Sequence, residues 1–300
     1  MELFSSKSHI DFISKRKLAY ALSLLMILTS LGSILFQGLN FGIDFSGGTL
    51  VQVKFHTPPN LKQIRTVLSS LDLGDVVIQE FGAPEEILIR VEKQATDAKA
   101  QSELSQKIIK TLEPIADQNS VDLRRVEFVG PQVGQELTEK GIMAVIYSMV
   151  AILFYVAWRF ELRFAYGAVL ALVHDLGITI GFFSLMQKEF TLVVVAALLT
   201  VIGYSLNDTI VVYDRIREEM KRFKSKDLTF IINEAVNRTL SRTLITSMTT
   251  LLVLVALLLF GGEVIHDFAL TLFLGVLIGT YSSVFVASPI VLILNKKISK

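Results

Sequence analysis

The chain contains no cysteine and only six prolines and one tryptophan. Its net charge is only +1 over 300 residues. The absence of cysteine excludes a disulfide-stapled scaffold, a zinc–thiolate site and a thiol nucleophile. The near-zero net charge argues against nucleic-acid binding through a basic surface. The low proline content and the 52% of hydrophobic residues exclude a disordered or collagen-like chain. A mean hydropathy of +0.55 instead indicates a membrane protein.

Six apolar stretches are long enough, or nearly so, to cross a bilayer as helices, which takes about 20 residues. The first follows Lys15, Arg16 and Lys17, but it is too long for a signal-peptide core and no A-x-A cleavage site follows it. We therefore interpret it as an uncleaved anchor. The predicted spans are residues 18–36, 141–158, 164–186, 190–213, 244–260 and 268–294.

The distribution of Lys and Arg predicts the orientation of these spans. Residues 1–17, 159–163, 214–243 and 295–300 together carry 17 basic and 8 acidic residues. The short loops on the other side carry a single basic residue, Lys188. By the positive-inside rule, both termini are expected in the cytoplasm and the long segment 37–140 outside it.

The segment 37–140 is long enough for a small core of its own. Its alternating apolar residues and turn signals predict strands at 45–55, 76–81, 87–91 and 121–129, and helices at 61–71 and 96–116. This βαββαβ order is that of the ferredoxin-like split motif, so we predict an inserted α+β domain. A compact plug and a surface that contacts substrate remain equally open as its role.

A glycine-rich stretch, residues 41–49, places Asp44 between Gly42 and the pair Gly47 and Gly48. Such a loop can cradle phosphate, but this function needs a following helix N-terminus and usually a lysine. A strand is predicted to follow here. We therefore interpret Asp44, Gly47 and Gly48 as a structural joint between the membrane and the inserted domain.

Ionisable residues inside the predicted spans are costly and are expected to mark a functional path. His174 and Asp175 lie near the middle of the third span, and Asn207 and Asp208 lie in the fourth. Arg242 precedes the fifth span by two residues. Asp208 could take up and release protons, with a mobile arginine changing its charge state. The alternative is that Asp208 only makes hydrogen bonds between helices, or pairs permanently with Arg242 or Arg215. For Asp175, with His174 beside it, both interpretations stay open.

Two further patterns concern packing and the membrane surface. The fourth span carries a stripe of small and polar residues, Ala196, Thr200, Gly203 and Asn207, which permits close helix contact. In the loop 214–243, an apolar face between residues 228 and 240 follows Asp227, a possible N-cap. This predicts an amphipathic helix on the cytoplasmic surface. The neighbouring basic residues suit anionic lipid heads, but a solvated positive-inside loop is the simpler account of them.

Five motifs in one order resemble those of the SecF family of bacterial protein-export subunits, in the SecD/SecF group of the RND superfamily. The resemblance extends from the first span to the sixth. The motifs are FGIDFSGGT at 41–49, VGPQVG at 129–134, HDLG at 174–177, GYSLNDT at 203–209 with VYDRIRE at 212–218, and SRTLITS at 241–247.

The resemblance implies a six-helix bundle resembling half of an RND transporter, in the bacterial cytoplasmic (inner) membrane. It implies a SecD partner, which would also cover an acid on an outward-facing helix seam. Further implied partners are the SecYEG channel, YajC, exported unfolded polypeptides and, indirectly, SecA. The energy source would be the proton-motive force, with no cofactor. Asp208, in the N-D-T motif, would carry the proton with Arg242, in the S-R-T motif, as its partner.

The alternatives to a protein-export subunit are a half-transporter for a small molecule or lipid, and a passive scaffold for a partner complex. An enzyme is not expected, because the chain has no H-E-x-x-H or serine-elbow motif. The clustered hydroxyl residues between Ser241 and Thr250 and the small residues of the sixth span predict helix faces suited to close neighbours or to water.

Overall fold

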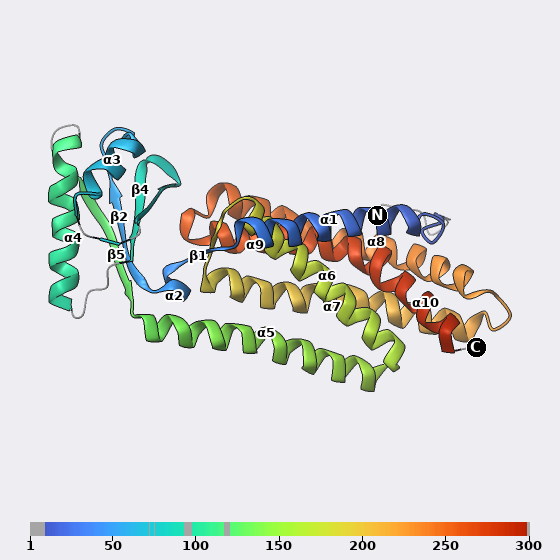
Figure 1. The fold of residues 1–300 in the computed structure, drawn as a ribbon. Helices are drawn as coiled ribbons and strands as arrows, with labels where there is room; N and C mark the ends of the chain where they lie inside the picture. The colour runs from blue at the N-terminus through green and yellow to red at the C-terminus, as the bar shows by residue number, and fades with distance from the viewer. Residues whose placement is uncertain (1–9, 72, 75, 93–97, 117–120, 299–300) are drawn as a thin grey trace. The chain divides into compact units, whose positions relative to one another are not determined.

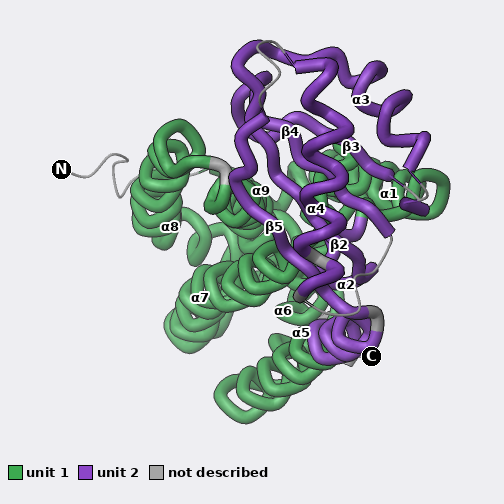
Figure 2. Tube along the Cα trace, turned by 90° about the vertical axis from the view of Figure 1, so that its left-hand side faces the viewer, with its two compact units in different colours: residues 1–40, 143–300 green, residues 41–142 purple. Residues whose placement is uncertain are grey.

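A computed structural model describes residues 10–71, 73–74, 76–92, 98–116 and 121–298. The chain divides into two compact units (Figure 2): a helical unit of residues 1–40 and 143–300, and an α/β unit of residues 41–142. The α/β unit is therefore an insertion between the first and second long helices. Each unit has its own hydrophobic core.

Six long apolar helices in the described part of the chain could cross a membrane by their length and composition. This agrees with the six spans expected from the hydropathy pattern. Figure 1 shows them as α1 (Arg16–Gln37), α5 (Pro131–Arg159), α6 (Leu162–Leu185), α7 (Leu192–Arg222), α8 (Leu228–Phe260), and a sixth built from α9 (Glu263–Ser282), the π-helical segment η3 (Ser283–Ala287) and α10 (Ser288–Ile298). The two-residue strand β6 (Glu189–Phe190) lies between α6 and α7.

The helices differ in how much of their surface the rest of the chain covers. In α6 and in the sixth helix, 61% of the most apolar stretch is buried, but only 6% is buried in α5. Side chains of α5 such as Phe154 and Trp158 are largely exposed. Exposed apolar side chains on a long helix are what a hydrocarbon surrounding requires, since lipid is as apolar as they are. The centre of the unit is thus formed by α6, α7 and α9.

The structure differs from the sequence prediction in the loop 214–243. Helix α7 continues to Arg222, and the predicted interfacial helix is the first part of α8, without a break before the fifth span. No glycine or proline occurs between Leu228 and Phe260 to end the helix. The apolar side chains Ile232 and Val236 are fully buried in the helical core. Asp227 is the N-cap, because its side chain accepts a hydrogen bond from the Thr229 N–H.

In the α/β unit, a four-stranded antiparallel sheet has the strand order β3-β4-β2-β5. Two helices pack on one face of this sheet through alternate apolar side chains, among them Val51 and Ile89 of the strands and Ile64 and Ile108 of the helices. The elements are β2 (Gly48–Lys54), α3 (Leu61–Leu68), β3 (Val76–Phe81), β4 (Ala83–Val91), α4 (Ala98–Leu112), the 3-10 turn η1 (Glu113–Ile115) and β5 (Asp122–Val129).

The first predicted strand of this unit, 45–55, begins later in the structure. Strand β1 (Asn40–Phe41) is followed by one turn of helix, α2 (Ile43–Ser46), and the main strand starts only at Gly48. The fourth predicted strand, 121–129, corresponds to β5, which begins one residue later. The first two residues of the predicted helix 96–116 lie outside the described residues.

Close approach of α1 and α6 depends on a glycine. A Cβ atom added at Gly181 would collide with Ser30 of α1, whereas a Cβ at Gly177, one turn earlier in α6, would meet open space. We expect Gly181→Ala to lower the free energy of unfolding by about 1–3 kcal/mol, because added volume in a packed interface strains it. Gly177→Ala is the matched control and should leave stability nearly unchanged. Thermal unfolding of the two purified variants checks this, and equal melting temperatures would contradict it.

Candidate functional site

Asp208 is the buried carboxylate at the centre of the candidate site. It lies on α7 and is 9% exposed. Its Oδ1 accepts a hydrogen bond from Thr243 Oγ1 at 2.6 Å, and its Oδ2 accepts one from Ser283 Oγ at 2.5 Å. Three segments far apart in the chain, α7, α8 and η3, therefore meet at this carboxylate. Each oxygen has a donor, which partly replaces the water that burial removes.

The π-helical segment η3 supplies one of these donors. Pro289 lacks a backbone N–H and cannot continue the regular α-helical hydrogen bonds, so a local change of helix type before it has a physical cause. The Ser288 hydroxyl also donates to the Ser283 carbonyl at 2.8 Å, across this segment. Such π turns frequently occur at functional sites. Here the π turn begins at Ser283, the residue that contacts Asp208.

Arg242, the expected partner of Asp208, is not paired with it in this conformation. Among the described residues, no ion pair within 4.0 Å joins these two side chains, and Arg242 is exposed. The other candidate cation, Arg215, contacts Glu218 at 2.6 Å and Glu219 at 2.9 Å instead. A permanent ion pair of Asp208 with either arginine is therefore not the arrangement observed. Thr243, the residue after Arg242, makes the contact.

Asn207 is exposed on the surface of α7, whereas the carboxylate of Asp208, the next residue, is buried. The whole small and polar stripe of this helix, which also includes Ala196, Thr200 and Gly203, is exposed. This corrects one expectation from the sequence. The acid itself is covered by the same chain and needs no partner to shield it, whereas the stripe is the polar surface that the chain leaves uncovered.

Asp175 and His174 form a second buried cluster on α6. Asp175 is fully buried, and its Oδ1 lies 2.9 Å from His174 Nδ1. Its Oδ2 accepts hydrogen bonds from Ser205 Oγ at 2.6 Å and from Ser282 Oγ at 2.8 Å. Ser282 and Ser283 are adjacent in sequence, so consecutive hydroxyls on one helix serve the two intramembrane carboxylates.

Sequence reasoning missed several of these partners. Ser205 lies in the GYSLNDT motif but was not singled out, Ser282 carries no motif, and Ser283 stood out only as one of a series of small residues. Only the packing of the helices shows which of these hydroxyls point toward an acid. In the described part of the chain, no group of three or more His, Cys, Asp or Glu side chains could hold a metal ion.

The glycine loop has a clear steric basis. Gly47 and Gly48 adopt positive φ angles of 70° and 115°, which residues with a Cβ rarely adopt. A Cβ at Gly48 would also lie 2.6 Å from the carbonyl oxygen of Val91 in the neighbouring strand. Asp44 lies in α2, the single helical turn before these glycines. The local geometry accounts for both glycines without a ligand.

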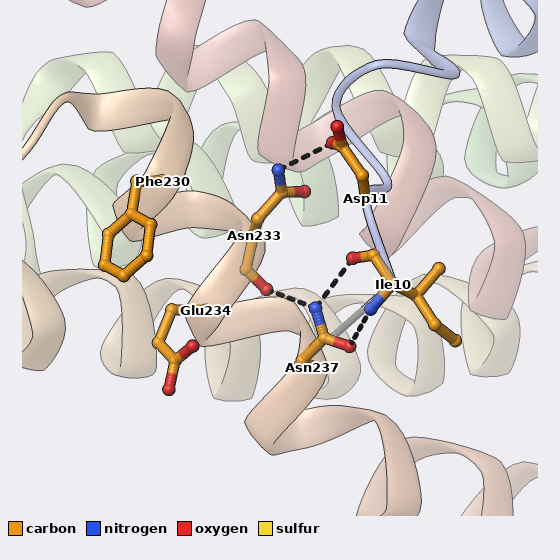
Figure 3. Close-up of a pocket in the computed structure, with 6 residues that line it drawn as sticks. All are labelled: Ile10, Asp11, Phe230, Asn233, Glu234 and Asn237. Atoms are coloured by element: carbon orange, nitrogen blue, oxygen red, sulfur yellow. Dashed lines mark hydrogen bonds between the residues drawn. The ribbon is translucent and has the colours of Figure 1, made fainter. Parts of the chain in front are cut away.

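A clasp of hydrogen bonds holds the N-terminal segment against the first part of α8 (Figure 3). The Asn237 side chain accepts a hydrogen bond from the Ile10 N–H at 2.9 Å and donates one to the Ile10 carbonyl at 2.8 Å. One turn earlier, Asn233 accepts from the Ile13 N–H at 3.0 Å and donates to Asp11 at 2.7 Å. These two asparagines lie on the same helix as Arg242, so the clasp connects the start of the chain to the helix that carries this arginine.

The charge of Asp11 contributes to this clasp. Hydrogen bonds from the Ser14 backbone N–H and the Asn233 side chain hold the pKa of Asp11 below its ordinary value of 3.8. Because the pKa is lowered in the folded state, the stabilisation is complete above the ordinary value and is lost as the pH falls through the folded value. At neutral pH the clasp is therefore in its stronger state.

We expect Asn237→Ala to open this clasp. The backbone groups of Ile10 lose both side-chain partners, so the amides of residues 10–14 should exchange with solvent deuterium about tenfold faster, as follows from the loss of about 1–2 kcal/mol of hydrogen bonding. Hydrogen exchange read by mass spectrometry measures this. Lys224→Ala, an exposed change outside the clasp, is the control, and unchanged exchange in Asn237→Ala would contradict the prediction.

Comparison with known proteins agrees with these motifs. Residues 108–297 match the family model described as protein export membrane protein SecD/SecF, C-terminal, and residues 32–59 match the SecD/SecF GG motif. The second match contains the glycine loop. The two matches together cover the end of α1, the glycine loop after it, and the helices from α5 to α9 with nearly all of α10.

Curated relatives and solved structures extend the comparison. The chain is 65% identical to the protein translocase subunit SecF of Magnetococcus marinus, with 98% of this chain and 95% of the relative covered, and 46% identical to that of Vibrio alginolyticus, with 97% and 91% covered. SecDF from Thermus thermophilus, a translocon-associated membrane protein, matches with a TM-score of 0.88 and 34% identity over 98% of this chain and 40% of that structure. On these findings the chain belongs to the SecD/SecF family of protein-export membrane proteins, and within that family it is most similar to the SecF subunits.

Proposed function

We propose that this chain works with a SecD-like subunit and uses the proton-motive force to promote the late steps of protein export across the bacterial cytoplasmic membrane. The observation that carries this proposal is the position of Asp208. A carboxylate buried among three helices, and held by hydroxyl groups instead of a cation, can gain or lose a proton without breaking an ion pair. Each proton that crosses the potential supplies about 2.3 kcal/mol per 100 mV.

Arg242 is proposed as the group that changes the proton affinity of this site. In the observed conformation the arginine is exposed and Thr243 donates to the carboxylate. A rotation of α8 that brought Arg242 toward Asp208 would favour the ionised carboxylate and release the proton. The clasp between the N-terminal segment and Asn237 lies on the same helix and would move with it. His174, Asp175 and Asn207 remain lesser candidates for the same path.

The uncovered stripe on α7 supports a second membrane subunit as partner. Small and polar residues at positions 196, 200, 203 and 207 are exposed although they lie on a helix long and apolar enough to span the membrane. Such a face suits close packing with another helix, since small side chains let backbones approach. The solved relatives named SecDF are longer chains, of which this chain spans 40%. A SecD-like subunit is the proposed occupant of this face.

The orientation and the inserted unit complete the proposal. The excess of Lys and Arg in the segments 1–17, 159–163, 214–243 and 295–300 supports cytoplasmic termini. The α/β unit then lies outside the membrane, where an exported polypeptide emerges. We infer that it is a ferredoxin-like domain, from its βαββαβ order and its strand order β3-β4-β2-β5. Its glycine loop is proposed as the joint to the first span.

The wider assembly follows from the same proposal. The subunit would associate with the SecYEG channel and YajC, act after the ATP-driven step of SecA, and contact exported unfolded polypeptides and membrane lipids. It would perform no covalent chemistry and need no cofactor. Export of a small molecule or lipid is the alternative that the experiment below separates from this function.

The proposal predicts that Asp208→Asn abolishes the stimulation of protein export by a proton gradient. The asparagine keeps the shape of the side chain but cannot take up and release the proton. Export into membrane vesicles, measured with and without the gradient, should then be equal. Asp214→Asn is the matched control on the same helix: Asp214 is exposed and pairs with Arg159 at 3.7 Å, so its loss should leave the stimulation in place.

Full gradient-dependent stimulation in Asp208→Asn would refute the relay role. A second outcome tests the function as a whole. If vesicles that lack the chain export proteins normally but accumulate a drug or lipid, the chain belongs to a small-molecule exporter instead.

A further inference from the structure

A chain of hydrogen bonds connects the His174–Asp175 pair to α1 and α9. His174 Nε2 lies 3.1 Å from Ser23 Oγ on α1, and Ser23 Oγ lies 3.0 Å from the Tyr281 hydroxyl on α9. The Tyr281 hydroxyl in turn donates to the Ala19 carbonyl on α1 at 2.8 Å. The Tyr281 ring also stacks beside the imidazole, with 6.1 Å between ring centres.

Counting the protons in this chain fixes the state of the histidine. A carbonyl oxygen can only accept, so the single proton of the Tyr281 hydroxyl is used on Ala19. Ser23 must then donate its own single proton to Tyr281. The remaining contact, between Ser23 and His174 Nε2, is a hydrogen bond only if Nε2 carries a proton. All three contacts therefore require the Nε2–H form of His174.

The same count extends to the carboxylate. Both hydroxyls at Asp175 Oδ2, from Ser205 and Ser282, donate to it, so the one proton of the contact with His174 lies between Oδ1 and Nδ1. With Nε2 already protonated, the pair is either imidazolium with carboxylate or neutral imidazole with neutral acid. In both cases it holds one proton more than a neutral histidine beside an ionised aspartate, and it has no net charge. A neutral pair is also cheaper to bury than a lone carboxylate.

We propose that His174 and Asp175 form a second one-proton site, and that its proton fixes α1 to α9. When the proton leaves, Nδ1–H faces the carboxylate and Nε2 becomes an acceptor. Ser23 must then donate to Nε2 and accept from Tyr281, so Tyr281 no longer donates to the Ala19 carbonyl. One proton thus reverses the direction of the whole hydroxyl chain and removes a contact between the two helices.

This site is separate from Asp208 and does not depend on the relay proposed there. Among the described residues, the other ionisable side chains with buried groups on α6 and on the helices packed around it are Tyr20 of α1, Arg163 of α6, and Asp208, Tyr213, Arg215 and Glu219 of α7. Arg163 pairs with Glu161, and Arg215 pairs with Glu219. Tyr20 has a buried hydroxyl without a hydrogen-bond partner among the described residues. Asp208 is held by Thr243 and Ser283, and Tyr213 donates to the Ala287 carbonyl, so neither belongs to the His174 chain.

The test is to observe which ring nitrogen of His174 carries the proton. The full chain, co-purified with its SecD-like partner and placed in lipid nanodiscs, is labelled with ¹⁵N-histidine and studied by solid-state NMR across the pH range in which it stays folded. Loss of a signal in His174→Gln assigns the residue. We expect a protonated Nε2 at the acidic end, and a change to bare Nε2 with protonated Nδ1 at the alkaline end.

Three variants make the test specific. Tyr281→Phe removes the acceptor of the Ser23 proton, so Ser23 can donate to Nε2, and the ratio of protonated to bare Nε2 at a fixed pH should fall roughly fivefold, the effect of about one hydrogen bond. Tyr20→Phe removes a nearby hydroxyl outside the chain and should leave this ratio unchanged. In Asp175→Asn the new side chain cannot ionise, and its amide N–H donates to Nδ1 of His174. Nε2 should therefore stay protonated at every pH.

Two results would overturn the proposal. One is a bare Nε2 in the unmodified protein at every pH tested. The other is an identical ratio in Tyr281→Phe and Tyr20→Phe, which would show that the hydroxyl chain has no influence on the proton. Because the readout is the proton on His174, it can fail or succeed independently of the export measurement on Asp208.

Discussion

The cost of burying a carboxylate organises the helical unit. Asp175 and Asp208 have little or no contact with solvent, and a buried charge or acid is tolerated only when its oxygens have hydrogen-bond donors. Apart from His174, the donors to these two acids among the described residues are serine and threonine hydroxyls. They come from α7, α8 and the middle of the sixth helix, where α9 meets η3. The positions of these helices relative to one another are therefore tied to two acids.

This requirement also explains the composition of the neighbouring helices. A hydroxyl reaches a carboxylate on another helix only if the two backbones are close, and close approach needs small residues at the contact. Gly279 packs beside Ser205, the hydroxyl that donates to Asp175. Gly181 of α6 likewise packs beside Ser30 of α1. Hydroxyl donors are neutral, so they allow a carboxyl group to exist with or without its proton, which a fixed arginine partner would not.

The ends of the helical unit use a different interaction. On the cytoplasmic side of the proposed topology, Glu219 is buried and lies 2.9 Å from Arg215 and 3.0 Å from Arg238. The neighbouring asparagines of α8 hold the N-terminal segment through its backbone. Charged pairs thus join α7 to α8 outside the apolar stretch, where water can solvate the remaining groups, whereas hydroxyl pairs join them inside it.

The sequence by itself determined which segments are apolar enough to span, the order of strands and helices in the inserted unit, and which acids are unusual. These properties depend on local composition, periodicity and the high cost of charge in lipid, so they can be found without coordinates. The sequence also singled out Arg242, whose role as partner of Asp208 stays a prediction. It divided α8 into two helices, because a change from an amphipathic to a fully apolar pattern was mistaken for a boundary.

Only the tertiary structure decided which hydroxyl serves which acid. The sequence does not single out the hydroxyls of Ser23, Ser282 and Tyr281, and it does not mark Ser205 of the GYSLNDT motif as a donor. The roles of these residues depend on the rotation of each helix about its axis. That rotation is set by the packing of all the helices together, including the π turn before Pro289. It also decided that Asp208 faces inward while Asn207, the residue before it, faces out, because successive residues of a helix point about 100° apart.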